Sequence, residues 1–430
     1  MKKINFYSYI LISICLFLYF SGYFFREISN GAGHTDLQKH IWLLLNDFNK
    51  DYINTLKNYL IYKEATFPFF HTLQHIFNPF KQTVFGYTLS NTIFNLVILF
   101  IFYHYIKKKE IFGENRTLII LIPFIFLLSP WFRSTSYWGL TENFAILFLI
   151  PACFYFNKLI QKEDFFKTNI LLTIFLSLTI YSRQQYIYLV FSHLIIILFL
   201  DRNLKNIITT LLIYFILSLP GLYTYYLWGV HENLSNATHS FEDLYSLGNI
   251  IQNIPKISSI LLFYTIPIII FNYKNFFNIL RKKTFILSFV LIYFIEFLLF
   301  KDLKYDTQGG GFIIKFYKIF LNENNYFLIF ISSLFFSLAF TVRKEINKEY
   351  YLILFFVFIT IGLTITLYQE WFDPIYIILY YLLLPNNLIS KIRISNQNFL
   401  FFLYFWEFMI LLIAIIYYHF YLKIPFFYNF

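Results

Sequence analysis

The sequence predicts an all-α polytopic membrane protein, a bundle of about 11–13 transmembrane helices. Three observations carry this prediction: 59% of the residues are hydrophobic, only 13% are charged, and long apolar runs alternate with short basic segments. A soluble domain is about a quarter charged and could not bury so many apolar side chains. The net charge of +11 does not indicate nucleic acid, because the basic residues stand mostly between apolar runs. We expect membrane lipids, and no nucleic acid, as partners.

Apolar runs of about 20 residues define the individual spans. The first begins near the N-terminus, where no small-residue cleavage site follows, so it is predicted to be an anchor rather than a signal peptide. The candidate stretches are 5–25, 86–106, 117–131, 143–157, 168–181, 186–200, 206–227, 257–273, 284–300, 325–341, 351–368, 374–388 and 398–421.

The basic residues predict the orientation of these spans. With the N-terminus in the cytoplasm, cytoplasmic segments hold 20 of the 34 Lys and Arg residues in roughly 55 loop positions. The outer segments hold the other 14 in roughly 140 positions, a threefold to fourfold lower density. The positive-inside rule therefore predicts a cytoplasmic N-terminus.

The chain is predicted to form one integral-membrane domain over residues 1–430. It divides into a long first outer loop (26–85), core transmembrane helices (86–300) and C-terminal transmembrane helices (301–430). The inner loops are short and the long loops are outer, so we expect function on the outer face. The first outer loop carries apolar residues at helical spacing, which predicts short amphipathic helices along the membrane surface. These residues are Leu37, Ile41, Leu44, Leu45, Ile53, Leu56, Leu60 and Ile61.

Asp36 is the candidate catalytic residue. It follows the glycines at 31 and 33 near the start of the first outer loop, at a predicted helix start just above the membrane. A carboxylate there could act as a general base that takes the proton from an attacking sugar hydroxyl. The alternative is that Asp36 only caps the helix that follows. His40, four residues later, would share a helical face with Asp36 and contact the substrate.

Arg183 is the candidate ligand for a donor phosphate. It lies in a tight outer turn with Gln184 and Gln185, which are candidate substrate contacts. A guanidinium binds phosphate with two parallel hydrogen bonds, so a lipid phosphate is a suitable partner. The alternative is that Arg183 pairs with a carboxylate of the protein or reaches the lipid headgroups.

Other polar residues of the outer segments extend the candidate site. Four lysines make the third outer loop basic against the positive-inside rule, which indicates an anionic ligand: Lys301, Lys304, Lys315 and Lys318. Of these, Lys301 and Lys304 are candidate ligands for the donor phosphate. Candidate substrate contacts on the remaining loops are Arg133, Glu142, Trp228, Gln369 and Glu370. The alternative for these is an aromatic belt with charges at water level.

No cofactor is expected. The sequence has no nucleotide-binding GxxxxGK[ST] motif, and Gly309–Gly311 does not follow a strand. His71 and His75 are four residues apart without an accompanying carboxylate pattern, so no metal site is predicted.

The first loop resembles that of the GT-C superfamily of integral-membrane glycosyltransferases, in which one helix precedes a long outer loop with an acidic residue near its start. Within that superfamily, three stretches are similar to the dolichyl-phosphate-glucose-dependent alpha-1,2-glucosyltransferase family and its bacterial relatives: Thr35–His40, Lys63–Pro68 and Arg183–Ile187. Two features depart from that family. Leu37 follows Asp36 where the family has Glu, and Gln369–Pro374 stands where the family has Asp-Asn-Arg-His.

The resemblance implies a function. It implies transfer of a hexose, glucose if the closer resemblance holds, from a polyprenyl-phosphate donor to a glycan or lipid-linked acceptor. Asp36 would be the base, the anomeric configuration would invert, and the lipid-phosphate sugar would be a co-substrate. A bacterial inner membrane is favoured, or the endoplasmic reticulum if the chain is eukaryotic. Two alternatives stay open: an oligosaccharide polymerase or ligase, and a flippase or transporter.

Overall fold

The computed structural model describes residues 6–29, 33–62, 67–113, 115–200, 203–227, 247–301, 325–343, 346–364, 367 and 371–424. It is 85% helical, and no strand occurs among these residues, which confirms the all-α prediction.

The N-terminal half alternates short helices with long ones. The long helices follow from near-continuous apolar sequence, and the short ones belong mostly to the first loop. They are α1 (Phe6–Phe24), α2 (Gly33–Asp36), the π-helix η1 (Leu37–Ile41), α3 (Trp42–Lys50), α4 (Tyr52–Lys57), the 3₁₀ helix η2 (Tyr59–Tyr62), α5 (Phe69–Phe77), α6 (Val84–Phe94), α7 (Leu96–Lys109), α8 (Arg116–Phe124), the 3₁₀ helix η3 (Ile125–Leu128), α9 (Pro130–Trp138), α10 (Glu142–Ile160), α11 (Phe165–Ser182), the 3₁₀ helix η4 (Gln184–Tyr186), α12 (Ile187–Leu200) and α13 (Leu204–Leu227).

The C-terminal half consists mainly of long apolar helices. They are α16 (Leu247–Phe271), α17 (Tyr273–Leu280), α18 (Lys283–Phe300), α20 (Asn325–Val342), α21 (Lys348–Gly362), α22 (Ile375–Ile378), the π-helix η7 (Leu379–Leu383), α23 (Asn386–Lys391), α24 (Gln397–Ile415) and the π-helix η8 (Ile416–Tyr421).

Each of the thirteen predicted spans coincides with a helix or a broken helix. Among the described residues, eight helices are long and apolar enough to cross a membrane. A ninth candidate is the pair Arg116–Leu128 and Pro130–Trp138, which bends by 68°. Shorter apolar helices occupy Ser8–Phe24 and Gln184–Phe199. These helices confirm a multi-pass membrane protein.

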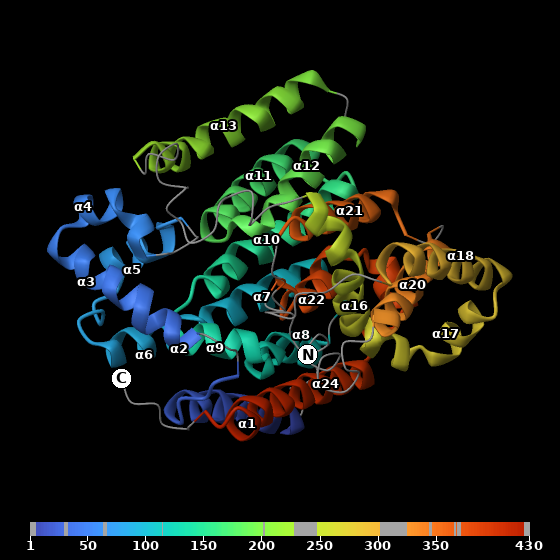
Figure 1. Cartoon of the computed structure of the whole chain (residues 1–430), viewed down its shortest axis with the longest axis horizontal. Helices are drawn as coiled ribbons and strands as arrows, with labels where there is room; N and C mark the ends of the chain where they lie inside the picture. The colour runs from blue at the N-terminus through green and yellow to red at the C-terminus, as the bar shows by residue number, and fades with distance from the viewer. Residues whose placement is uncertain are drawn as a thin grey trace.

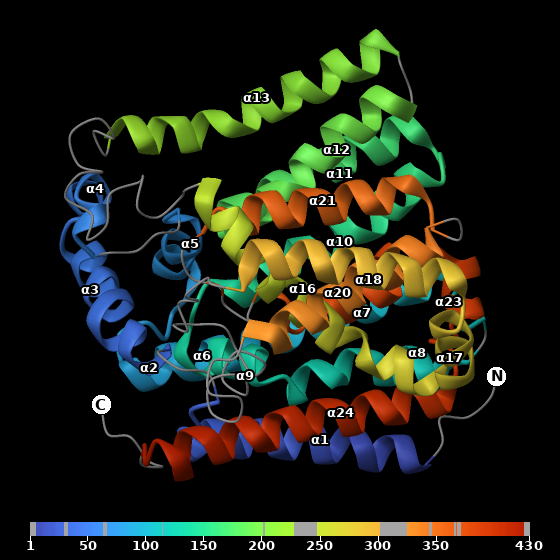
Figure 2. The same ribbon diagram turned by 45° about the vertical axis from the view of Figure 1, so that its right-hand side comes forward.

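The two ends of the bundle differ as the loop lengths predict. The start of α1, α17 and α23 lie at one end of the molecule, and α2, α3 and α4 lie at the other (Figure 2). These three parts of the chain, which carry or adjoin segments predicted to be cytoplasmic, are thus opposite the first-loop helices. Three helices lie at the edge of the bundle. The helices α1 and α24 lie side by side (Figures 1 and 2), and α13 packs on α11, with 11% of its apolar window buried.

The helix α9 is a short, buried element on which the site is built. Ser129 caps it by accepting the amide hydrogen of Phe132, and Pro130 supplies its first turn without needing an amide donor. It ends at Gly139, whose φ of +65° suits glycine, and a Cβ there would lie 2.5 Å from the Tyr87 ring. The chain bends by 68° before α9. The C-terminal end of α9, at Trp138, packs against Gly33 of the first outer loop.

A buried ion pair fixes the start of the first loop against α9. Arg133 donates from Nε to Oε1 of Glu27 at 3.0 Å, and the two side chains are only 2% and 5% exposed. Arg133 also donates to the backbone carbonyls of Leu127 and Leu18 at 3.0 and 2.9 Å. The chain therefore leaves α1 along one fixed path.

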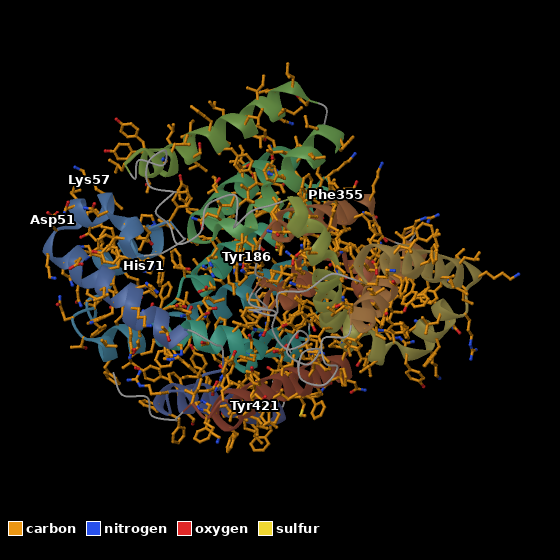
Figure 3. All side chains as sticks on the ribbon, viewed as in Figure 1. Asp51, Lys57, His71, Tyr186, Phe355 and Tyr421 are labelled. Atoms are coloured by element: carbon orange, nitrogen blue, oxygen red, sulfur yellow. The ribbon has the colours of Figure 1, made fainter. Side chains whose placement is uncertain are left out.

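The first outer loop forms helices, as its apolar spacing predicts. Leu37, Ile41, Leu44 and Leu45 are buried in the core. Ile53 and Ile61, which the same pattern includes, are 59% and 73% exposed. Figure 3 shows Asp51 and Lys57 at the outer edge of these helices. The helix α3 therefore buries its apolar face, as predicted. The helices α4 and η2 leave part of their apolar faces exposed.

Candidate active site

Asp36 is placed by the packing of α2 on α9. The helix α2 begins at Gly33, whose Cα lies so close to α9 that a Cβ would be 2.9 Å from Cδ1 of Trp138 and 3.1 Å from Oγ of Ser134. Glycine is needed here because any side chain would push α2 away from α9. Asp36 follows in the same helical turn.

Replacing Gly33 with alanine is expected to lower transfer activity at least tenfold and stability by about 1–3 kcal/mol, the usual cost of overpacking. The added methyl group displaces α2, and a shift of about 1 Å at a catalytic group can cost about 100-fold in rate. Initial rates and thermal unfolding of the purified protein check both. Gly113→Ala is the control for activity only: a Cβ there meets nothing within 4 Å, but its φ of +52° strains an alanine and lowers stability. Equal activity of the two variants would contradict this account of how Asp36 is placed.

Asp36 does not cap the helix that follows it. Its backbone is already helical (φ −64°, ψ −42°), and its side chain makes no capping hydrogen bond to η1. The capping alternative is therefore wrong. Burial raises the pKa of the Asp36 carboxyl to about 6, and the neighbouring Glu142 carboxylate acts in the same direction. The positive charges of His40 and Arg183 partly oppose both effects.

Glu142 and Arg183 form an ion pair close to Asp36. The antiparallel helices α10 and α11 have 19 and 18 residues, so the first residue of α10 is level with the turn after α11. Arg183 stands in that turn with an extended backbone (φ −152°) between α11 and η4. Its Nη2 donates to Oε1 of Glu142, and the two side chains are 18% and 13% exposed. The structure therefore shows the stated alternative, in which Arg183 pairs with a carboxylate of the protein.

One polar atom of this pair, and one of the turn that follows Arg183, have no partner within the described part of the chain. They are Oε2 of Glu142 and Nε2 of Gln185, both shielded from solvent. Buried polar atoms without partners are costly, so they indicate groups that a ligand would satisfy. Gln184 and Gln185 are partly buried in η4, directly after Arg183. Figure 3 places Tyr186, the last residue of η4, near the middle of the molecule.

The structure brings together four of the twelve predicted site residues: Asp36, His40, Glu142 and Arg183. Gln184 and Gln185 adjoin Arg183 in sequence. Four others lie outside the described residues: Trp228, Lys304, Gln369 and Glu370. Lys301 is exposed at the end of α18, with its ammonium over the ring of Phe297 in the same helix, and α18 packs against α20.

Arg133 does not join this group. Its guanidinium is 2% exposed and bonded to Glu27 and to two backbone carbonyls, so the protein shields it from a substrate. The prediction of Arg133 as a substrate contact is therefore wrong. Its buried partner Glu27 was not predicted, although a buried arginine requires a counter-charge and Glu27 stands just after the first span.

Buried acids also occur away from Asp36. Glu296 of α18 accepts hydrogen bonds from Ser332 and Ser333 of α20 at 2.8 and 2.9 Å. Asp373 and Glu407 are fully buried as well, and the sequence pattern did not reveal them. Tyr376 donates to Glu407. No group of three or more His, Cys, Asp or Glu residues suited to a metal ion occurs within the described ranges.

Comparison with known families adds one finding. Residues 68–225 match the sequence model of the family described as dolichyl-phosphate-mannose-protein mannosyltransferase. The match covers a little over a third of the chain, and it includes Glu142 and Arg183 but not Asp36. No curated protein and no solved structure matches the chain. The family match supports a membrane glycosyltransferase of GT-C type, and it does not confirm the closer resemblance to the glucosyltransferase family.

Proposed function

We propose that the chain is a membrane hexosyltransferase that takes its sugar from a polyprenyl-phosphate donor. The observation that carries the proposal is the convergence of Asp36, Glu142 and Arg183 in one partly buried place. These residues come from three separate segments of the chain. The family match, whose name contains a dolichyl-phosphate-linked sugar donor, supports the donor class.

Asp36 is the base in this proposal. An acceptor hydroxyl gives its proton to the Asp36 carboxylate as its oxygen forms a bond to the anomeric carbon. The bond from that carbon to the phosphate oxygen breaks, and its electron pair leaves with the polyprenyl phosphate. Attack on the face opposite the leaving group inverts the anomeric configuration. The sugar is glucose or mannose, and the acceptor is a glycan or a lipid-linked glycan on the outer face.

Arg183 binds the donor phosphate. Its guanidinium matches two phosphate oxygens and stabilises the charge that grows on the leaving phosphate. Gln185, with its unpartnered amide nitrogen, and Gln184 would contact the sugar or the acceptor. The phosphate is already a good leaving group, so positioning and charge stabilisation supply most of the rate.

The transfer rate is expected to fall as the pH drops through about 6. Asp36 acts only when it is deprotonated, and its raised pKa of about 6 places the loss there rather than near 4. Below that pH, kcat/KM should fall about tenfold per unit. Initial rates of purified protein between pH 4.5 and 8 check this, since a phosphodiester donor does not titrate in this range. A flat profile down to pH 5 would contradict Asp36 as the base.

Deletion of the gene in its native host tests the function itself. Mass spectrometry of surface and lipid-linked glycans should show one glycan that lacks a single hexose. Unchanged glycans together with altered uptake of a solute would contradict the transferase and favour a transporter.

A further inference from the structure

The guanidinium of Arg183, which the donor phosphate binds in the proposed function, is already paired with the carboxylate of Glu142. Both side chains are less than a fifth exposed, so the pair is not a solvated surface contact. A phosphate that binds Arg183 must therefore take the place of Glu142 or share the guanidinium with it. Either outcome changes the charge next to Asp36.

Glu142 stands between two charged partners. Its Oε1 accepts from Arg183, and its Oε2 has no partner within the described ranges. The charged groups that act on Asp36 are Glu142 of α10, Arg183 of the turn before η4, and His40 of η1. The helix α9, which also packs on α2, faces Gly33 with Ser134 and Trp138. A change at Arg183 therefore reaches Asp36 directly and, with the larger effect, through Glu142.

We propose that Glu142 is a positioning residue that couples donor binding to activation of the acceptor. In the free enzyme, Arg183 neutralises Glu142. When the donor phosphate takes Arg183, Glu142 keeps its negative charge without a counter-ion beside Asp36, and Asp36 becomes a stronger base. This inference rests on the proposed function, because it assumes that the phosphate binds Arg183.

The proposed exchange gives the reaction an order. Without donor, Asp36 is a weaker base and an acceptor or water molecule is not activated. With donor bound, the acceptor proton passes to Asp36 while the anomeric carbon exchanges its phosphate oxygen for the acceptor oxygen. After the polyprenyl phosphate leaves, Arg183 returns to Glu142, and Asp36 releases its proton to water.

Proton uptake on binding of a donor analogue tests the coupling without turnover. The probe is methyl farnesyl phosphate, a phosphodiester with one fixed negative charge and no group that titrates between pH 4 and 9. Calorimetry of the full chain in detergent at pH 6.5, in buffers of different ionisation enthalpy, measures the protons taken up. If the pKa of Asp36 rises by one unit from about 6, the wild type takes up about half a proton.

Two variants are expected to bind the probe with less proton uptake than the wild type. Glu142→Gln removes the coupling charge and should bind the probe more tightly, because the phosphate no longer displaces a carboxylate. Asp36→Asn removes the group that accepts the proton. The matched control is Glu163→Gln, which removes a carboxylate from an ion pair with Lys158 at the other end of α10. It should behave like the wild type.

Each outcome bears on one of the two proposals. Equal uptake by the wild type and Glu142→Gln, or binding by the wild type without uptake, would overturn the coupling and leave the donor class standing. Failure of the wild type to bind the probe would instead count against Arg183 as the phosphate ligand. If Glu142→Gln unfolds, Glu142→Asp keeps the charge on a shorter side chain. It should then restore the uptake, and a folded Glu142→Asp without uptake would overturn the coupling.

Discussion

Asp36→Asn is expected to reduce sugar transfer by about 10²–10⁴-fold, which is the usual contribution of a general base. Asparagine has nearly the same shape as aspartate, but it cannot take the proton of the acceptor hydroxyl. The donor should still bind, because the proposed phosphate ligand Arg183 is unchanged. The rate of donor consumption by purified protein, together with probe binding, measures these two effects separately.

The same variant is expected to be at least as stable as the wild type. Burial raises the pKa of Asp36 from 3.8 to about 6, so ionisation of this carboxylate lowers the free energy of unfolding. That cost grows as the pH rises from 3.8 to about 6 and stays constant above, so asparagine should raise the melting temperature near pH 7.5. A catalytic residue that costs stability behaves in this way, whereas a structural residue does not.

Asp47→Asn is the matched control within the same loop. Asp47 lies in α3, pairs with Lys50 at 2.8 Å and accepts a hydrogen bond from Tyr62 at 2.6 Å. Its removal should leave the transfer rate within about twofold, because a group that is not a general base lacks that contribution. Near-normal transfer by Asp36→Asn, or equal losses in the two variants, would contradict the role of Asp36.

Glu27→Ala is expected to lower the free energy of unfolding by about 3–5 kcal/mol, the usual cost of leaving one partner of a buried ion pair alone. Without Glu27, the guanidinium of Arg133 stays buried with only two carbonyl partners. Gly22→Ala should act in the same direction, since its Cβ would overlap both Arg133 and Glu27. Thermal unfolding in detergent measures the loss.

Glu163→Ala is the matched control for this prediction. It removes the partner of Lys158 at 3.0 Å, but those side chains are 50% and 36% exposed, so the loss should stay below about 1 kcal/mol. Equal destabilisation by Glu27→Ala and Glu163→Ala would show that the pair of Glu27 and Arg133 does not hold the first loop in place.

The sequence was sufficient to predict the helices, because apolar runs in a membrane leave little other choice of structure. It also marked Asp36 and Arg183 as candidates, since a carboxylate just outside the first span and an arginine in a tight outer turn are unusual on chemical grounds. What it could not predict was which charges meet. Arg133 and Glu142 are nine residues apart in the sequence. Nevertheless, Arg133 is buried in the core, whereas the charge of Glu142 acts on Asp36.

The missed residues share one physical cause. Glu27 and Arg133 are 106 positions apart, and Tyr376 and Glu407 are 31 apart, so their contacts depend on tertiary packing rather than on local pattern. The same cause explains the exposed Ile53 and Ile61, whose helical spacing predicted a buried face. Periodicity tells which residues share a helix face, and it does not tell whether another element covers that face.

Donor consumption tests the central claim most directly. Purified protein is incubated with polyprenyl-phosphate glucose, polyprenyl-phosphate mannose or the matching nucleotide sugars, each with glycolipids extracted from the native host. Mass spectrometry then measures the released polyprenyl phosphate and the acceptor that gains one hexose. We predict that one lipid-linked hexose is consumed only when acceptor is present, that Asp36→Asn abolishes this, and that nucleotide sugars are not used. Transfer from a nucleotide sugar, or no consumption of either lipid-linked hexose, would contradict the proposed function.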